Sequence, residues 1–223
     1  MAQKFVWDDA LLLDDQLSEE ERQIRDSIAS FAQAELMPRI LKWNREETFD
    51  PDIMKEFGSL GILGATIPDY GCAGIGRVAY GLACRELERV DTAFRSAVGV
   101  QTGLAMSAIY DFGSAEQKNR FLPGMREGSL IGCFGLTEPD HGSDAGSLQT
   151  RAKTCDGGYK LNGTKVWITH SPVADLLIVW ARDDSGSIGG FILERGMKGL
   201  ETPKIEGKFG VRASPTGFIM MDD

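Results

Sequence analysis

The pattern of the sequence changes at about Ser129, and this change limits the folds open to the chain. Before it, apolar residues recur at helical spacing, whereas after it short apolar runs alternate with turn sequences. Helices followed by strands are typical of an α+β arrangement and not of alternating βαβ units. We therefore predict an all-α helical domain at 1–128, followed by a β-barrel or β-sandwich domain at 129–223.

Capping residues indicate where the helices begin. Ser18 and Glu21 form a capping box, and the helix they start should run to about Asn44, with a kink or break at Pro38. Other helix starts are indicated by cap residues or by a glycine-rich loop: Asp50-Pro51, 71–76, Asp91-Thr92 and Ser114 with Gln117. We expect the last of these helices to end near Pro123.

The second part of the chain contains β-like runs separated by turn signals. The runs are 130–136, 160–161, 166–169, 176–181, 190–193 and 217–221. Asp156-Gly157-Gly158 and Asn162-Gly163 are turn sequences between them. Their short, regular spacing predicts an antiparallel sheet or barrel.

Composition excludes several classes of function. The net charge of -9, from 24 basic and 33 acidic residues, disfavours nucleic-acid binding, which needs a basic face. The four cysteines are dispersed and only two histidines are present, so no zinc or iron–sulfur site is predicted. The N-terminus has no secretion signal or Arg-rich transit peptide, and no apolar run approaches the roughly 20 residues of a membrane span. These features favour a reducing, intracellular setting.

A polar segment follows the first apolar run of the second half, from Gly135 to Asp144. Gly142 lets the backbone approach a ligand closely, and Ser143 offers both a hydroxyl and an N–H donor. Successive amides in such a turn form a concavity suited to phosphate. A plain polar turn explains the same residues, and no Rossmann fingerprint is present.

A second segment, Lys165 to Thr169, lies on the run that the Asn162-Gly163 turn should open. By strand alternation Trp167 and Thr169 would point to one side and Ile168 to the other. An aromatic ring beside a hydroxyl suits a flat heterocycle. An ordinary surface strand explains this segment equally well.

In this order after a helical half, the two segments resemble the flavin signature of the acyl-CoA dehydrogenase family. That signature is Leu-Thr-Glu-Pro-x-x-Gly-Ser-Asp followed by Trp-Ile-Thr, and the resemblance extends over essentially the whole chain. It implies FAD as the cofactor. The residues that match the family's flavin contacts are Phe134, Leu136, Thr137, Gly142, Ser143, Trp167, Ile168 and Thr169.

The resemblance also implies individual roles. In the family, the threonine that matches Thr169 points its hydroxyl at flavin N5, and the serine that matches Ser143 also lies near the CoA thioester. His141 departs from the family pattern, which more often has a small residue there. We assign His141 no catalytic role.

Three stretches, 36–40, 70–74 and 86–98, resemble glutaryl-CoA dehydrogenases in particular. In that subfamily an arginine matching Arg95, with neighbours matching Ser96 and Glu88, binds the distal carboxylate of the substrate. Electrostatics favours this role for the arginine, because a buried carboxylate is costly unless a guanidinium pairs with it. A surface ion pair of little energetic value is the alternative for Glu88 and Arg95.

The resemblance implies oxidative decarboxylation of glutaryl-CoA to crotonyl-CoA and CO2, with electrons passed to an electron-transfer flavoprotein. The family's base is a glutamate of a C-terminal helical domain that nothing here matches, so we expect no catalytic base in this chain and no turnover by this chain alone. Neither Glu88 nor Glu138 is nominated. The alternatives are another acyl specificity, a non-decarboxylating glutaryl enzyme or a non-catalytic flavin- or CoA-binding module. A homotetramer is expected, in the bacterial cytoplasm or, for a processed eukaryotic form, the mitochondrial matrix.

Overall fold

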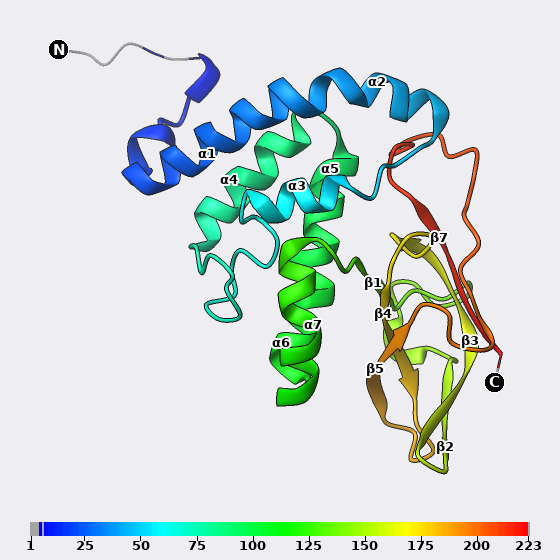
Figure 1. Ribbon diagram of the computed structural model, residues 1–223. Helices are drawn as coiled ribbons and strands as arrows, with labels where there is room; N and C mark the ends of the chain where they lie inside the picture. The colour runs from blue at the N-terminus through cyan, green and yellow to red at the C-terminus, as the bar shows by residue number, and fades with distance from the viewer. Residues whose placement is uncertain (1–4, 6, 223) are drawn as a thin grey trace.

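A helical half and a curled β half lie side by side in the computed structural model, which describes residue 5 and residues 7–222 (Figure 1). The α-helices are α1 (Glu19–Phe31), α2 (Met37–Glu46), α3 (Ile53–Ser59), α4 (Arg77–Glu88), α5 (Thr92–Gly99), α6 (Ser107–Phe112) and α7 (Ala115–Glu127). The strands are β1 (Gly132–Gly135), β2 (Arg151–Cys155), β3 (Gly158–Thr169), β4 (Leu176–Arg182), β5 (Ile188–Glu194), β6 (Leu200–Glu201) and β7 (Thr216–Asp222). The expected fold class, helices and then a β domain, is confirmed.

The first helix begins as its sequence predicts but does not break at its proline. Glu21 N donates to Ser18 Oγ, and Ser18 N donates to the Glu21 carboxylate, which completes the capping box. A π-helical segment, η3 (Ala32–Leu36), joins α1 to α2 just before Pro38. The wider π turn accommodates the proline without a break, because the wider spacing adjusts the backbone hydrogen bonds next to it.

Helix α7 also begins at its capping box, with Gln117 N donating to Ser114 Oγ. The expectation that it ends near Pro123 is wrong, because the helix continues to Glu127. Its last turn carries Met125, which is fully buried, and that burial favours another helical turn beyond the proline.

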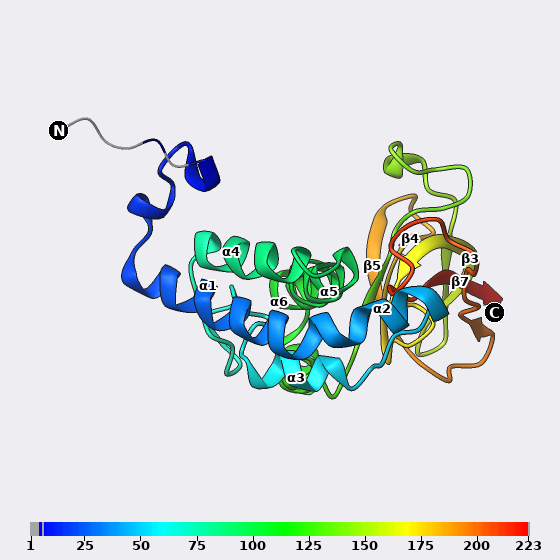
Figure 2. The same cartoon turned by 90° about the horizontal axis from the view of Figure 1, so that it is seen from above.

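The sheet is mixed, with the strand order β1-β4-β2-β3-β7-β6 and with β5 on the other edge of β4. The expected purely antiparallel arrangement is wrong in two places, because β1 and β2 both pair with β4 in parallel. Strands β2 and β6 were not expected from the sequence. Figure 2, from above, shows the curl of the sheet beside the helices.

Asn162-Gly163 is not a turn, since both residues lie inside the long strand β3. Gly163 has a φ of 148° and faces Thr150, and a Cβ on Gly163 would lie 2.9 Å from the Thr150 Cα. Glycine at this position therefore allows two backbones to pass closely in the sheet, and the Asn-Gly pair resembles a hairpin turn only in its composition.

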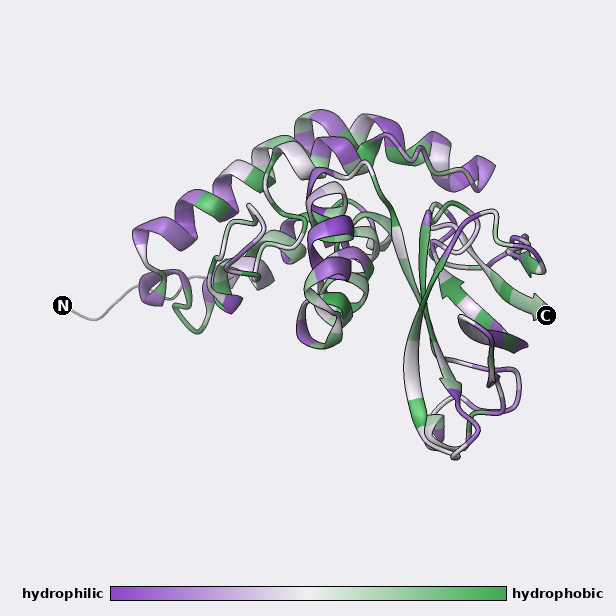
Figure 3. Cartoon of the chain, turned by 60° about the horizontal axis from the view of Figure 1, so that its bottom comes forward, coloured by the Kyte–Doolittle hydropathy of each residue, from purple (hydrophilic) through white to green (hydrophobic). Residues whose placement is uncertain are grey.

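One apolar core extends from the helices into the sheet. Phe57 and Phe94 from the helices belong to the same buried cluster as Cys133, Val179 and Ile219 from the strands. Figure 3 shows apolar residues concentrated along the strands and mixed with polar ones along the helices. The two halves therefore hold one another in fixed positions. Among the described residues, no helix is long and apolar enough to cross a membrane.

Candidate functional site

The two motif segments meet in space. The first leaves β1 at Gly135 and makes a turn in which Glu138 N donates to His141 O and His141 N donates to Glu138 O. Val166 N of the second segment donates to Thr137 O over 2.9 Å. A direct backbone hydrogen bond thus joins segments that are almost 30 residues apart in sequence.

A buried ion pair lies beneath the turn. Glu138 is 5% exposed and Lys165 is completely buried, and Lys165 Nζ donates to a Glu138 carboxylate oxygen over 2.8 Å. Lys165 also donates to Leu136 O, and Glu138 also accepts from Thr150 N and Oγ1 and from Gln149 N. Because both charges have several partners, the pair fixes the turn on β3.

Hydrogen bonding decides the charge of Glu138. Burial alone would raise the pKa of its carboxyl, but donors from Lys165, Thr150 and Gln149 lower it to about 2. Burial lowers the pKa of Lys165, and the neighbouring Glu138 opposes this. A carboxylate held in this way accepts hydrogen bonds and is a poor base, so Glu138 is a structural residue of the turn.

A β-bulge interrupts β3 between Lys165 and Ile168, so strand alternation is broken between these two residues, which are both buried. Trp167 has a φ of 61° and is 62% exposed, whereas Ile168 is buried and Thr169 is half-buried. The bulge therefore turns the indole ring outward and keeps Ile168 in the core.

The exposed part of this region suits a flat heterocycle that carries phosphate. The Trp167 ring offers an open aromatic surface. Among the described residues, the backbone N–H groups of Thr137, Gly142 and Ser143 have no protein acceptor. A Cβ on Gly142 would meet nothing within 4 Å, so a ligand can approach its backbone closely. Phe134 packs against Trp180 behind the turn, with ring centroids 5.8 Å apart.

A second polar group lies on the helical half. Arg95 Nε on α5 donates to a Glu88 carboxylate oxygen at the end of α4 over 2.9 Å, and Thr92 Oγ1 donates to the other oxygen over 2.6 Å. The side chains of Glu88 and Arg95 are each 43% exposed. The hydrogen bond from Thr92, and then that from Arg95, lower the pKa of Glu88. Ser96 follows Arg95 on α5 and is half-buried.

Two residues beside Arg95 were missed by the sequence analysis. Tyr80 and Cys84 lie on α4 at four-residue spacing before Glu88, and both side chains are half-buried. Burial raises the pKa of both Tyr80 and Cys84, while the charge of Arg95 acts against it. The recurrence of polar residues every four positions along α4 was the signal available in the sequence.

Comparison with family models matches both halves. Residues 18–129 match the model described as "Acyl-CoA dehydrogenase, N-terminal domain", and residues 133–223 match "Acyl-CoA dehydrogenase, middle domain". The chain belongs to the acyl-CoA dehydrogenase family.

Solved structures of family members superpose closely on this chain. A glutaryl-CoA dehydrogenase from Mycobacterium smegmatis is 46% identical, with a TM-score of 0.93 over 96% of this chain and 56% of that one. A structure of a glutaryl-CoA dehydrogenase from the same organism, in complex with FADH2, is 44% identical with a TM-score of 0.92, covering 94% of this chain and 54% of that one.

Curated relatives have other names. The mitochondrial isovaleryl-CoA dehydrogenase of Pongo abelii is 37% identical over 216 residues, which cover 93% of this chain and 51% of that protein. The chain spans about half the length of the curated relatives it matches. Relatives of this acyl-CoA dehydrogenase chain therefore include enzymes named for different acyl groups.

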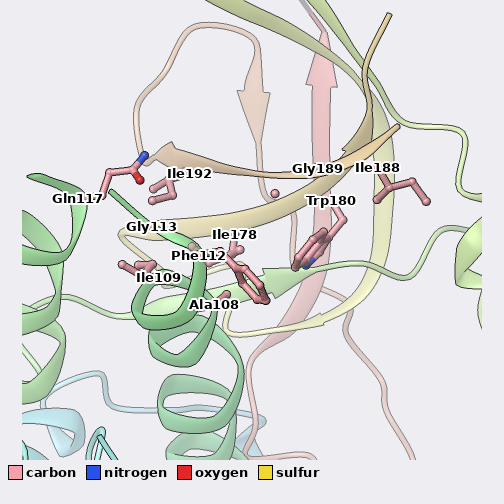
Figure 4. Close-up of a pocket in the computed structure, with 11 residues that line it drawn as sticks. Ala108, Ile109, Phe112, Gly113, Gln117, Ile178, Trp180, Ile188, Gly189 and Ile192 are labelled. Carbon is pink, nitrogen blue, oxygen red and sulfur yellow. The ribbon is translucent and has the colours of Figure 1, made fainter. Parts of the chain in front are cut away.

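An apolar cleft of about 370 Å³ separates α6 and α7 from the β4–β5 hairpin (Figure 4). Phe112 and Ile188 stand at its opposite walls, and Trp180 lies between them. Trp180 Nε1 is buried and has no acceptor within the described ranges 5 and 7–222. No local pattern in the sequence indicates this cleft, because its walls come from two segments far apart in the chain and carry no motif.

Proposed function

We propose that this chain is the flavin- and acyl-binding portion of an acyl-CoA dehydrogenase that acts on glutaryl-CoA. The arrangement of Arg95 is the observation that carries the dicarboxylic preference. Within the described part of the chain its one hydrogen-bond partner is Glu88, and that bond uses Nε, so the terminal nitrogens remain for a substrate carboxylate. Both side chains are partly exposed, which lets an incoming carboxylate reach the guanidinium.

We assign FAD to the surface formed by the turn after β1 and the bulge of β3. Phe134, Leu136, Thr137, Gly142 and Ser143 would hold it from one segment. The other segment would contribute Trp167, Ile168 and Thr169. Bound FAD would supply the acceptor for a hydride from the β-carbon of the acyl chain. Two observations support this assignment: the open amides of the turn and the outward ring of Trp167.

The protein's own residues would bind and orient the substrate. Arg95 would exchange its contact with Glu88 for the distal carboxylate, with Ser96 as a further donor, while Ser143 would lie beside the thioester. Glu138 is engaged by Lys165 and Glu88 by Arg95 and Thr92, so we nominate neither as the base for the α-proton. We assign that base to polypeptide outside this chain, since the chain spans about half the length of its relatives.

The products would be crotonyl-CoA and CO2, with electrons passed to an electron-transfer flavoprotein. We propose a homotetramer, in the cytoplasm of a bacterium or in the mitochondrial matrix. A neutral acyl-CoA is the second candidate substrate, and the resemblance to isovaleryl-CoA dehydrogenases favours it.

Anaerobic titration of the complete polypeptide, reconstituted with FAD, tests the proposed activity. Addition of glutaryl-CoA should bleach the visible flavin band, and crotonyl-CoA should be found by mass spectrometry. Bleaching by isovaleryl-CoA but not by glutaryl-CoA would favour the second candidate. A protein that cannot be reconstituted with FAD would refute the flavoenzyme assignment.

A further inference from the structure

A completely buried glutamine joins the helical half to the strand that leads into the turn after β1. Gln101 lies in η4 (Val100–Met106), the π-helical segment between α5 and α6, and its side chain is 0% exposed. Its amide nitrogen donates to Met125 O over 2.9 Å and to Leu130 O over 2.8 Å, and its amide oxygen accepts from Gly132 N over 2.7 Å. These bonds use both amide hydrogens and one amide-oxygen lone pair.

The strand lies very close to the helix at this point. A Cβ on Gly132 would come within 2.6 Å of the Ala105 Cβ and 2.7 Å of the Met125 Cε. Glycine therefore permits β1 to lie directly against η4, and Gln101 supplies the hydrogen bonds across the contact. Strand β1 runs only from Gly132 to Gly135, and the turn follows it directly. The position of Gly132 against η4 therefore determines where the turn begins.

The same helical rod carries Arg95 on a more exposed side. Segments α5, η4 and α6 follow one another without interruption from Thr92 to Phe112. Arg95 and Leu104 are partly exposed, whereas Gln101 is buried against β1. One rod thus holds the proposed carboxylate anchor and, through Gln101, the strand that leads into the proposed flavin surface.

We propose that Gln101 is a positioning residue for the dehydrogenation, an inference that rests on the proposed function. It fixes β1 against η4. The distance between Arg95 and the cofactor surface is then fixed too, so that an acyl chain anchored at Arg95 places its β-carbon beside the bound cofactor. Gln101 touches neither substrate nor cofactor. A change in it should therefore alter the rate of hydride transfer and leave the binding of glutaryl-CoA nearly unchanged, since misplacement of reacting groups by about 1 Å can cost roughly a hundredfold in rate.

The test is the reductive half-reaction of the complete, FAD-loaded polypeptide in an anaerobic stopped-flow instrument. Gln101→Met keeps the shape of the side chain and loses all three hydrogen bonds. We expect the rate constant of flavin bleaching at saturating glutaryl-CoA to fall roughly tenfold to a hundredfold. The Kd for glutaryl-CoA should stay close to the wild-type value.

A second set of variants moves the strand and keeps the glutamine at position 101. Gly132→Ala should give the same kinetic signature, because the added methyl group pushes β1 away from Ala105. The double variant G132A/A105G makes room for that methyl group and should regain most of the rate. This set decides the question if Gln101→Met does not fold.

Arg212→Met is the matched control for stability. It removes an ion pair with Glu47 and hydrogen bonds to the backbone carbonyls of Asn44 and Lys208, and it lies outside the proposed site, so it should lower the Tm without changing the bleaching rate. If Gln101→Met and Gly132→Ala bleach at the wild-type rate, the inference is overturned and the proposed function stands. If no acyl-CoA bleaches the wild-type protein, both are overturned.

Discussion

The two charged pairs of the candidate site differ in almost every physical respect. The side chains of Glu138 and Lys165 are buried in the β half and take part in five hydrogen bonds, whereas those of Glu88 and Arg95 are each 43% exposed on the helical half. An exposed pair contributes little to stability, but a buried and hydrogen-bonded pair is costly to break. The comparison shows that the buried pair maintains a shape and the exposed pair is free to exchange partners.

This difference matches the two proposed tasks. A cofactor surface has to stay in one conformation through every turnover, and the buried pair fixes the turn that forms it. A substrate anchor has to release its resting partner each time substrate binds. The exposed pair is therefore suited to recognition because it is weak.

Loss of the buried pair should have the largest effect on stability. Glu138→Gln leaves the Lys165 charge buried without its counter-ion, so the free energy of unfolding of the complete polypeptide should fall by about 3–5 kcal/mol. Guanidinium unfolding monitored by circular dichroism measures it. A loss below about 1 kcal/mol, the value for exposed pairs, would contradict the claim that the buried pair contributes more to stability than the exposed pair.

The same carboxyl should give stability a recognisable pH dependence. The pKa of Glu138 is about 2 in the folded protein, below its ordinary value of 4.5. Its contribution is therefore complete above pH 4.5 and is lost as the pH falls towards 2. The difference in unfolding free energy between wild type and Glu138→Gln should narrow over that window. A difference that stays constant down to pH 2 would contradict the assigned charge state.

Displacement of Thr150, a hydrogen-bond partner of the Glu138 carboxylate, should lower the free energy of unfolding by a smaller amount. Gly163→Ala places a methyl group against Thr150, which donates two hydrogen bonds to Glu138. We expect a stability loss of about 1–3 kcal/mol, typical of overpacking. Gly158→Ala, where φ is 159° and a Cβ meets nothing within 4 Å among the described residues, is the control for the backbone cost alone. Equal losses at the two glycines would show that the close approach to Thr150 is unimportant.

The exposed pair should have the smallest effect on folding. Glu88→Gln should lower the free energy of unfolding by less than about 1 kcal/mol. The same variant should change the binding of glutaryl-CoA, because Arg95 loses its resting partner. Unfolding and titration of one preparation measure both. A loss as large as that of Glu138→Gln would make the two pairs alike.

The sequence predicts the helix starts and the motif segments well, because caps and turns are local. Ser18 and Ser114 start their helices as expected, and the fold class follows from the change of pattern near Ser129. The predicted turn at Asn162-Gly163 is wrong, because glycine is needed there only for the close approach of the Thr150 backbone, which is a tertiary contact. The parallel pairing of β1 with β4 joins segments more than 40 residues apart, which no local pattern encodes.

The residues of the candidate site also fall into two groups, those that the sequence indicates and those that only the tertiary structure identifies. Arg95 and the flavin-motif residues come from sequence patterns, and their proposed roles remain predictions. Lys165 and Gln101 emerge only in three dimensions, since each is a polar residue whose partners lie about 25 to 30 positions away. Burial of a polar side chain with several partners identifies such residues, and burial is a tertiary property.

The most direct test of the account compares Arg95→Ala with the wild type on two substrates, using the complete, FAD-loaded polypeptide. We predict that kcat/KM for glutaryl-CoA falls roughly ten- to a hundredfold more than kcat/KM for a neutral straight-chain acyl-CoA, because the lost hydrogen bonds are to a charged group. Equal losses on the two substrates would contradict the role of Arg95 as the carboxylate anchor.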